Sequence, residues 1–241
     1  MAQAHPGRLD SNGGHWNKKT EQYECHKDYC IPKAERKISD TIKSPELNKI
    51  QTLKIEEKGE VSEAISGLVI VPDSAIPDKN DIPKYNRKTW KHWIDLDGDC
   101  QDTRAEALII AAKGNVKFKD SKNCEVVSGN FYGQYTNTYM KRDGDLDVDH
   151  IVPLNEAHLT GGYKWSKALK MQFANDPLNI IAVNKGENRS KSDKYPGKWM
   201  PPYKAYHCEY LERWIGVKKK YSLQIRQSTI DMSIISCKGK K

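Results

Sequence analysis

The sequence predicts an α+β fold, because short strand patterns and helical patterns follow one another without a repeated βαβ unit. Residues 146–152 alternate apolar and polar side chains until Pro153 ends the run, which is typical of a β-strand. A second short apolar run, residues 180–183, precedes a polar stretch, residues 184–191, that favours a turn leading into a helix. We therefore expect a strand, a long connection, a second strand and a helix, in this order.

Further elements are expected on both sides of that unit. A helical pattern covers residues 211–221, and an amphipathic helix is expected over residues 165–175, with Trp165, Leu169 and Phe173 on one face. Two short strands are expected between residues 114 and 129, an aromatic turn at residues 131–136 and a last strand at residues 221–226.

Changes in composition divide the chain into four segments. Residues 1–35 form a Gly-, His- and Cys-rich N-terminal module, and residues 36–84 read as a linker or peripheral arm with a short strand at 67–72. Residues 85–221 are expected to form the main folded domain. Residues 222–241 are expected to supply a C-terminal strand and a basic tail.

The composition restricts the class of partner. The 241 residues are 37% hydrophobic and carry a net charge of +8, with a mean hydropathy of −0.81. No apolar run approaches the ~20 residues of a membrane span, so no membrane partner is expected. The positive charge suits a polyanion such as a nucleic acid. Charge alone does not identify such a partner, since many basic proteins bind none.

The cysteines indicate an oxidising compartment. Their number is even and none forms a Cys-x-x-Cys motif, which favours disulfides in a secreted or periplasmic protein. Proximity along the chain favours the pairs Cys25–Cys30, Cys100–Cys124 and Cys208–Cys237. The alternative is six free thiols in a cytosolic protein.

The N-terminal module leaves a second reading open. It resembles a short histidine-rich module of secreted bacterial proteins, and His15, Cys25, His26 and Cys30 could bind zinc. A Cys25–Cys30 disulfide beside two surface histidines is the simpler reading.

Three polar residues near the two central strands suit a one-metal phosphodiesterase. A histidine ordinarily titrates near neutral pH, so His150 could deprotonate an attacking water. Asp149 and the amide oxygen of Asn188 could hold a hard cation such as Mg²⁺, which would stabilise the leaving 3′ oxygen. An Asp–His pair at a strand end is usually an ordinary polar loop, so the interpretation depends on the joint spacing of the motifs.

The motifs resemble those of the HNH, or ββα-metal (His-Me finger), endonucleases. DVDHIVP and NRSKSD are similar to the HNH domain of the RNA-guided CRISPR nucleases. DVDHIVPLNEAH, FANDPLN and NRSK, followed by Pro196 and Trp199, are similar to the small secreted HNH endonucleases of bacteria, over about residues 85 to 210. The resemblance implies a ββα-metal core with added helices, short strands and long loops, so residues 85–221 would be the nuclease domain.

The resemblance also assigns roles. His150 would be the general base, Asp149 a metal ligand, and Asn179 the residue that orients the histidine. Asn188 would be the second metal ligand in place of the last histidine of the motif, which favours Mg²⁺, with Mn²⁺ as a substitute, over Zn²⁺. Cleavage would leave a 5′-phosphate and a 3′-hydroxyl.

Residues 95–106 carry two further expectations. Acids at positions 1, 3 and 5 and a glutamate at position 12 mimic a Ca²⁺-binding EF-hand loop from Asp95 to Glu106, but Cys100 stands where the loop requires glycine. Calcium is therefore disfavoured there. The secreted nucleases carry a similar stretch, and that resemblance implies a helix over residues 103–112 whose N-terminus faces the site. The guanidinium of Arg104 on this helix could clamp a phosphate. A structural pair of Arg104 with Glu106 is the alternative.

A basic and aromatic surface is expected beside the site, and it fits the backbone of duplex DNA. A solvated lysine-rich face is the alternative, and RNA is the alternative substrate. The candidate nucleic-acid-binding residues are Lys185, Arg189, Lys191, Lys198 and Tyr135.

The function expected from the sequence is metal-dependent DNA cleavage by a monomer. No helix-turn-helix or zinc-finger motif accompanies the core, so low sequence specificity is expected. Two alternatives remain: a structure- or sequence-selective nuclease whose first 80 or so residues choose the target, and a catalytically inactive DNA- or metal-binding module.

Overall fold

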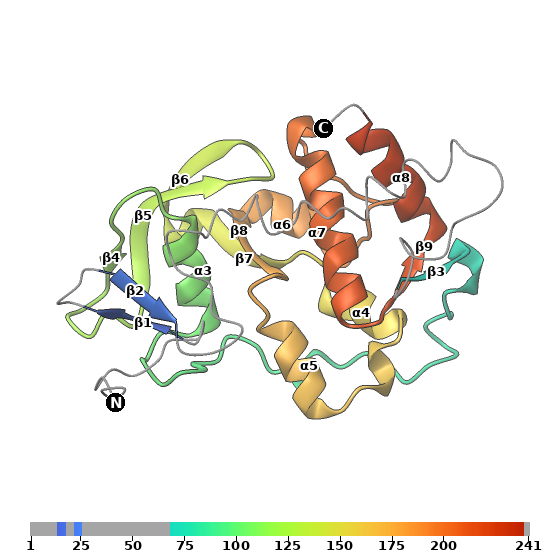
Figure 1. The fold of residues 1–241 in the computed structure, drawn as a ribbon, viewed down its shortest axis with the longest axis horizontal. Coiled ribbons are helices and arrows are strands. Elements are labelled where there is room, and N and C mark those ends of the chain that lie inside the picture. The colour runs from blue at the N-terminus through green and yellow to red at the C-terminus, as the bar shows by residue number, and fades with distance from the viewer. Residues whose placement is uncertain (1–13, 18–21, 26–67, 239–241) are drawn as a thin grey trace.

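The computed structural model describes residues 14–17, 22–25 and 68–238 (Figure 1). Near the N-terminus, β1 (Gly14–Asn17) and β2 (Gln22–Cys25) pair antiparallel. The expected zinc site and the Cys25–Cys30 disulfide fall outside the residues whose side chains are described. Among the described residues, no helix is both long enough and apolar enough to cross a membrane.

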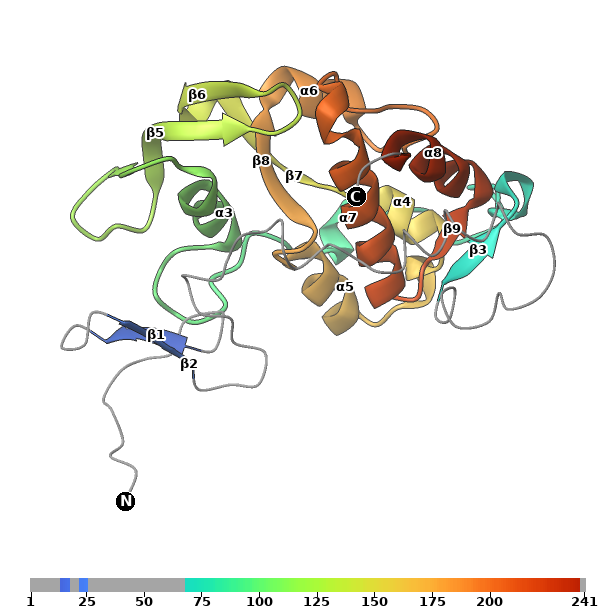
Figure 2. The ribbon, with the colours of Figure 1, turned by 45° about the horizontal axis from the view of Figure 1, so that its top comes forward.

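The centre of the fold is an antiparallel strand pair followed by a short helix. Strand β7 (Leu146–His150) pairs with β8 (Ile180–Asn184), and His150 lies opposite Ile180. Helix α6 (Lys185–Lys191) follows β8 directly and packs on both strands (Figures 1 and 2). The expected order of strand, connection, strand and helix is confirmed.

The long connection between the two strands is helical. It contains α4 (Leu154–Leu159), η5 (Gly162–Lys164) and α5 (Lys167–Ala174). Helix α5 starts at Ser166, whose side chain accepts the backbone N–H of Leu169, as a helix cap does. The helix expected at 165–175 is therefore confirmed.

One side of the strand pair carries α3 and a three-stranded sheet. Helix α3 (Thr103–Ala111) begins at Asp102, whose carboxylate accepts the N–H of Ala105. The sheet has the order β4-β5-β6, and its side chains form a core with Leu108, Val148 and Ile180. Its strands are β4 (Lys117–Phe118), β5 (Val126–Gly133) and β6 (Thr138–Arg142), with η4 (Asp143–Asp145) leading into β7.

The aromatic turn expected at residues 131–136 is only partly a turn. Phe131, Tyr132 and Gly133 belong to β5, and the turn follows them. Phe131 is fully buried in the core beneath α3. Burial of this side chain favours the strand over the turn.

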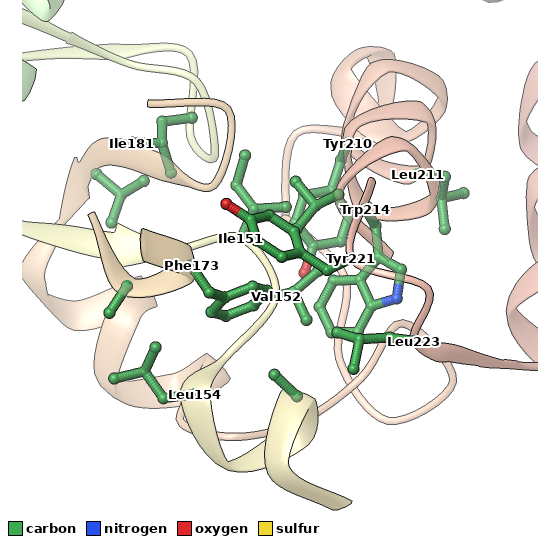
Figure 3. Packing of buried hydrophobic residues seen from close by; sticks show 14 of the residues in the cluster. Ile151, Val152, Leu154, Phe173, Ile181, Tyr210, Leu211, Trp214, Tyr221 and Leu223 are labelled. Carbon is green, nitrogen blue, oxygen red and sulfur yellow. The ribbon is translucent and has the colours of Figure 1, made fainter. Parts of the chain in front are cut away.

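The other side of the strand pair packs against α7 (His207–Lys220), which is preceded by η6 (Lys204–Tyr206). This is the larger core, and aromatic rings pack there among aliphatic side chains, as Figure 3 shows. Its central residues are Ile151, Val152, Leu154, Phe173, Ile181, Tyr210, Leu211, Trp214, Tyr221 and Leu223.

The two ends of the described main body meet. Strand β3 (Val69–Val71) pairs in parallel with β9 (Gln224–Arg226), and η2 (Asp73–Ala75) and η3 (Arg87–Thr89) follow β3 along the chain. The last helix, α8 (Gln227–Cys237), takes the place of most of the expected basic tail. Burial of Ile230 and Cys237 against β9 and α7 accounts for this helix.

Two of the expected disulfides are present. Cys100 is bonded to Cys124, and Cys208 is bonded to Cys237, so α8 is covalently tied to α7. Among the described residues no cysteine is free.

Candidate active site

His150, the last residue of β7, is held in one orientation. Its Nε2 lies 2.8 Å from the carbonyl oxygen of Ala174 at the end of α5. A carbonyl oxygen only accepts hydrogen bonds, so Nε2 carries the proton and Nδ1 keeps its lone pair. The indole of Trp93 stacks on the imidazole at 5.1 Å, and the ring of His92 lies edge-on at 5.9 Å.

The surroundings of His150 keep the imidazole neutral. Burial lowers its pKa to about 3, against the opposing effect of the Ala174 hydrogen bond. Electrostatic interaction with Arg87, with Lys191 and with the neighbouring His92 ring lowers the pKa of His150 further. A neutral imidazole with a free Nδ1 is the protonation state that a general base requires.

Asp149 lies on the opposite face of the strand and is also buried. Its Oδ2 accepts the hydroxyl of Tyr135 at 2.8 Å. The ammonium of Lys191 lies 2.9 Å from Oδ2 and 3.1 Å from Oδ1, and it also donates to the carbonyl oxygen of His150. Burial raises the pKa of Asp149, while the ion pair with Lys191 opposes that rise.

Two expected nucleic-acid contacts are therefore corrected. Lys191 and Tyr135 are both 0% exposed, so neither side chain can reach a nucleic acid in this structure. Lys191, at the end of α6, points inward to Asp149, and Tyr135 packs among Trp199, Tyr206 and Tyr210. Both residues hold Asp149 in place.

Asn188 lies one helical turn before Lys191 on α6. Its Nδ2 donates to Oδ2 of Asp147 at 3.1 Å. The amide oxygen of Asn188 is the side-chain atom that could ligate a metal ion. Asp147 is two residues before Asp149 and thus on the same face of β7. Asp147 was not among the predicted metal ligands, although acids alternate with other residues along 143–149.

The chemistry of these donors fits a magnesium-type ion. The carboxylates of Asp147 and Asp149 and the amide oxygen of Asn188 are hard oxygen ligands. A carboxylate has about four acceptor positions, and three contacts from Tyr135 and Lys191 use most of those on Asp149. A cation would therefore share Asp149 with the ammonium of Lys191.

The acidic loop at residues 95–99 is engaged with its own backbone. Asp95 accepts the N–H groups of Gly98 at 2.7 Å, of Asp99 at 3.2 Å and of Cys100 at 2.9 Å. The carboxylates of Asp95, Asp97 and Asp99 lie within 4.8 Å of one another. Calcium at this loop stays a prediction.

Asn179 acts on the chain after His150 rather than on its ring. Its Oδ1 accepts the N–H of Val152 at 2.8 Å and its Nδ2 donates to the Val152 carbonyl oxygen at 3.2 Å. Its own carbonyl oxygen accepts the N–H of Ile151. The ring of His150 is oriented by Ala174, so the expectation that Asn179 orients it is corrected: a side chain already bonded at both ends to Val152 supports the turn instead.

Asn175, beside Ala174, was also missed. Its side chain accepts the hydroxyl of Thr103 at 2.8 Å and the N–H of Ile94 at 3.3 Å, and it donates to the carbonyl oxygen of Lys91 at 2.8 Å. It thereby ties the start of α3 and residues 91–94 to the end of α5. No local pattern in the sequence pointed to these contacts.

The remaining predicted site residues lie around this centre. Arg104 is half-buried in the first turn of α3, and its role as a phosphate clamp stays a prediction. Lys185 and Arg189 lie on α6, the helix that carries Asn188, while Lys198 is exposed in the loop after it. Arg87, which sequence analysis did not single out, is the arginine whose charge acts on His150.

Comparison with known proteins gives a family. An "Uncharacterized secreted protein" of Arthroderma benhamiae is 34% identical over 163 residues, which cover 67% of this chain and 75% of the relative. That relative is fungal, so it does not support the expected kinship with bacterial and CRISPR nucleases. No solved structure matches the chain. The family described as "GmrSD restriction endonucleases, C-terminal domain" matches residues 103–232, which include β7, β8 and α6. The chain therefore belongs to the family of the GmrSD restriction endonuclease C-terminal domains, a nuclease family.

Proposed function

We propose that this protein is a metal-dependent endonuclease that hydrolyses DNA phosphodiester bonds with little sequence preference. The family supports a nuclease in general. The finer assignment rests on His150, a neutral buried imidazole whose Nε2 is fixed by Ala174 and whose neighbour is the carboxylate Asp149. In this proposal β7, β8 and α6 are the ββα unit of an HNH-type site.

His150 would act as the general base. Its Nδ1 would take a proton from water, and the resulting hydroxide attacks phosphorus and displaces the 3′ oxygen. The displaced oxygen takes a proton from solvent, which leaves a 5′-phosphate and a 3′-hydroxyl. The carbonyl oxygen of Ala174 accepts the Nε2 proton, so it would stabilise the imidazolium that forms. The stacked indole of Trp93 limits rotation of the ring. A fixed base of this kind contributes typically ~10²–10⁴-fold to rate.

Asp149 and Asn188, with Asp147 beside them, would hold Mg²⁺ or its substitute Mn²⁺. When bound, such an ion supplies positive charge to the scissile phosphate and to the leaving oxygen. Lys191 would keep the buried carboxylate of Asp149 ionised, and the hydrogen bond from Asn188 to Asp147 would orient the amide.

The substrate and compartment follow from charge and disulfides. The net charge of +8 suits a polyanion, and Lys185, Arg189 and Lys198 would contact phosphates near the site. We infer an extracellular protein, since the fungal relative is named as secreted and the structure contains two disulfides.

A plasmid-nicking assay tests this function. Supercoiled DNA should be nicked with Mg²⁺ or Mn²⁺ and left intact with EDTA, and 5′-end analysis of the products should find phosphate. Parallel lanes with single-stranded RNA test the alternative substrate. The ion pair of Lys191 with Asp149 also favours a second candidate, a nucleic-acid-binding module without activity. Binding without metal-dependent cleavage would establish that alternative.

A further inference from the structure

Residues 85–93 form a segment beside His150, of which the proposed mechanism has used only Trp93. Trp90 is fully buried in the larger core and fixes the segment to the body of the protein. Before it, Asn86 caps η3 by accepting the N–H of Lys88 at 3.0 Å. The residues on either side of Trp90 therefore have defined positions.

His92 connects this segment to Arg87. Its Nδ1 lies 2.7 Å from the carbonyl oxygen of Trp90, so Nδ1 carries the proton. Its Nε2 then accepts a hydrogen bond from the Arg87 guanidinium at 3.3 Å. The ring of His92 lies 5.9 Å from that of His150. The guanidinium of Arg87 and the ring of His150 thus share the imidazole of His92 as a neighbour.

Trp93 adopts a backbone conformation that is unusual for a bulky residue. Its φ is +55°, in the left-handed region that bulky residues rarely occupy. Such strain persists when surrounding contacts enforce it and is concentrated at functional sites. Here the conformation accompanies the stacking of the indole on His150 at 5.1 Å.

Arg87 is exposed and its charge is available. Within residues 68–238 it forms no ion pair with a carboxylate, and it contacts His92 and the hydroxyl of Tyr85. Its positive charge lowers the pKa of His150. Asp193, just after α6, acts electrostatically on both Tyr85 and Lys191. The segment and the end of α6 therefore lie close enough to each other to interact electrostatically.

We propose that Arg87 binds the non-bridging oxygens of the phosphodiester that is attacked, with His92 as its positioning residue. A phosphorus attacked by a water on His150 lies about 6 Å from the imidazole, as two successive contacts of about 3 Å. The guanidinium donates to Nε2 of His92, whose ring lies 5.9 Å from that of His150. Its planar fork can bind two phosphate oxygens at once. This inference rests on the proposed nuclease function.

The test compares Arg87→Ala with Lys88→Ala. Lys88 is the adjacent exposed cation, so its removal controls for a general change in charge. Two substrates are used, plasmid DNA and bis(4-nitrophenyl) phosphate, which has no extended backbone. Arg87→Ala should lower kcat about 10²-fold on DNA, and it should also lower whatever turnover of the small substrate can be measured. Added methylguanidinium should restore part of the activity. Lys88→Ala should stay within about twofold of wild type.

His92 is tested by a double-mutant cycle. His92→Ala should lower kcat in the wild-type background and change nothing further in Arg87→Ala, because it acts through the guanidinium. Additive decreases would overturn the positioning role. If Arg87→Ala fails to fold, Arg87→Lys serves instead: it keeps the charge but lacks the bidentate fork, and it should retain only part of the activity.

The outcomes separate the two proposals. An inactive wild-type protein would contradict the nuclease function itself. An active wild type, an inactive His150→Ala variant and an Arg87→Ala variant equal to Lys88→Ala would overturn only the role of Arg87.

Discussion

The two faces of β7 carry adjacent buried polar residues, and the surroundings favour the neutral form of one and the charged form of the other. His150 and its cross-strand neighbour Ile180 face the core beneath α3, whereas Asp149 and Ile181 face the core beneath α7. His150 is surrounded by rings and one carbonyl oxygen, which keep it neutral. Asp149 is given an ammonium and a hydroxyl, which favour its charged form.

The difference teaches what a buried polar group needs for its role. Burial alone disfavours charge, which suits a base that must be unprotonated. A carboxylate intended to hold a cation must remain ionised, and burial makes that costly without a partner. Lys191 is that partner, and its contact with the carbonyl oxygen of His150 joins the two faces at the end of the strand.

The largest loss of activity is expected on the face of β7 that carries the neutral His150. His150→Ala should lower nicking activity by ~10²–10⁴-fold, because the base is removed, while unfolding and DNA binding change little. His207→Ala is the matched control, since His207 also contacts a carbonyl oxygen, that of Pro201 at 2.7 Å, outside the site. Near-wild-type turnover of His150→Ala would show that another group is the base.

The face of β7 that carries the charged Asp149 is tested by Lys191→Met. This substitution keeps the length of the side chain and removes its charge. An unpaired buried Asp149 should lower the free energy of unfolding by about 3–5 kcal/mol, measured by urea denaturation at pH 7. The double variant with Asp149→Asn should recover part of this stability. Unchanged stability of Lys191→Met would mean that the ion pair is not formed in solution.

Metal binding on the same face is tested by Asn188→Ala. Removal of the amide oxygen should weaken Mg²⁺ or Mn²⁺ binding in a calorimetric titration, with a smaller effect on folding because Asn188 is only half-buried. Asn155→Ala is a control, since that amide bonds Asp193 at 2.8 Å instead. Equal affinities of both variants and the wild type would mean that the ion binds at another site, with residues 95–106 the next candidate.

The smallest effect concerns the exposed cations. Charge reversal of Arg189 and Lys198 should weaken binding to all duplexes alike and flatten its salt dependence by about 0.9 in log–log slope for each phosphate that the protein no longer binds. Binding is measured on His150→Ala protein so that the DNA stays intact. Lys117→Glu, on β4, provides the same change in charge at a distant place. A slope reduced equally by Lys117→Glu would indicate a non-specific effect of net charge.

Much of the central unit was predictable because its signals are local. Alternation along residues 146–152 and the apolar run at 180–183 depend only on neighbouring residues, and both strands and α6 form as expected. Proximity along the chain likewise predicted the pairs Cys100–Cys124 and Cys208–Cys237. The motif spacing also brought Asp149, His150 and Asn188 into one candidate site, whose metal-binding role stays a prediction.

The sequence by itself determined the order of strand, connection, strand and helix, since side-chain periodicity sets which face of each element is apolar. Only the tertiary structure decided which polar groups meet. A lysine at the end of a polar helix reads as exposed, and Lys191 is buried only because β7 brings Asp149 within 2.9 Å of it. Arg87 approaches His150 through His92 across more than fifty residues of sequence, and β3 pairs with β9 across a still longer separation. Contacts between residues so far apart depend on how the cores pack, which no local pattern encodes.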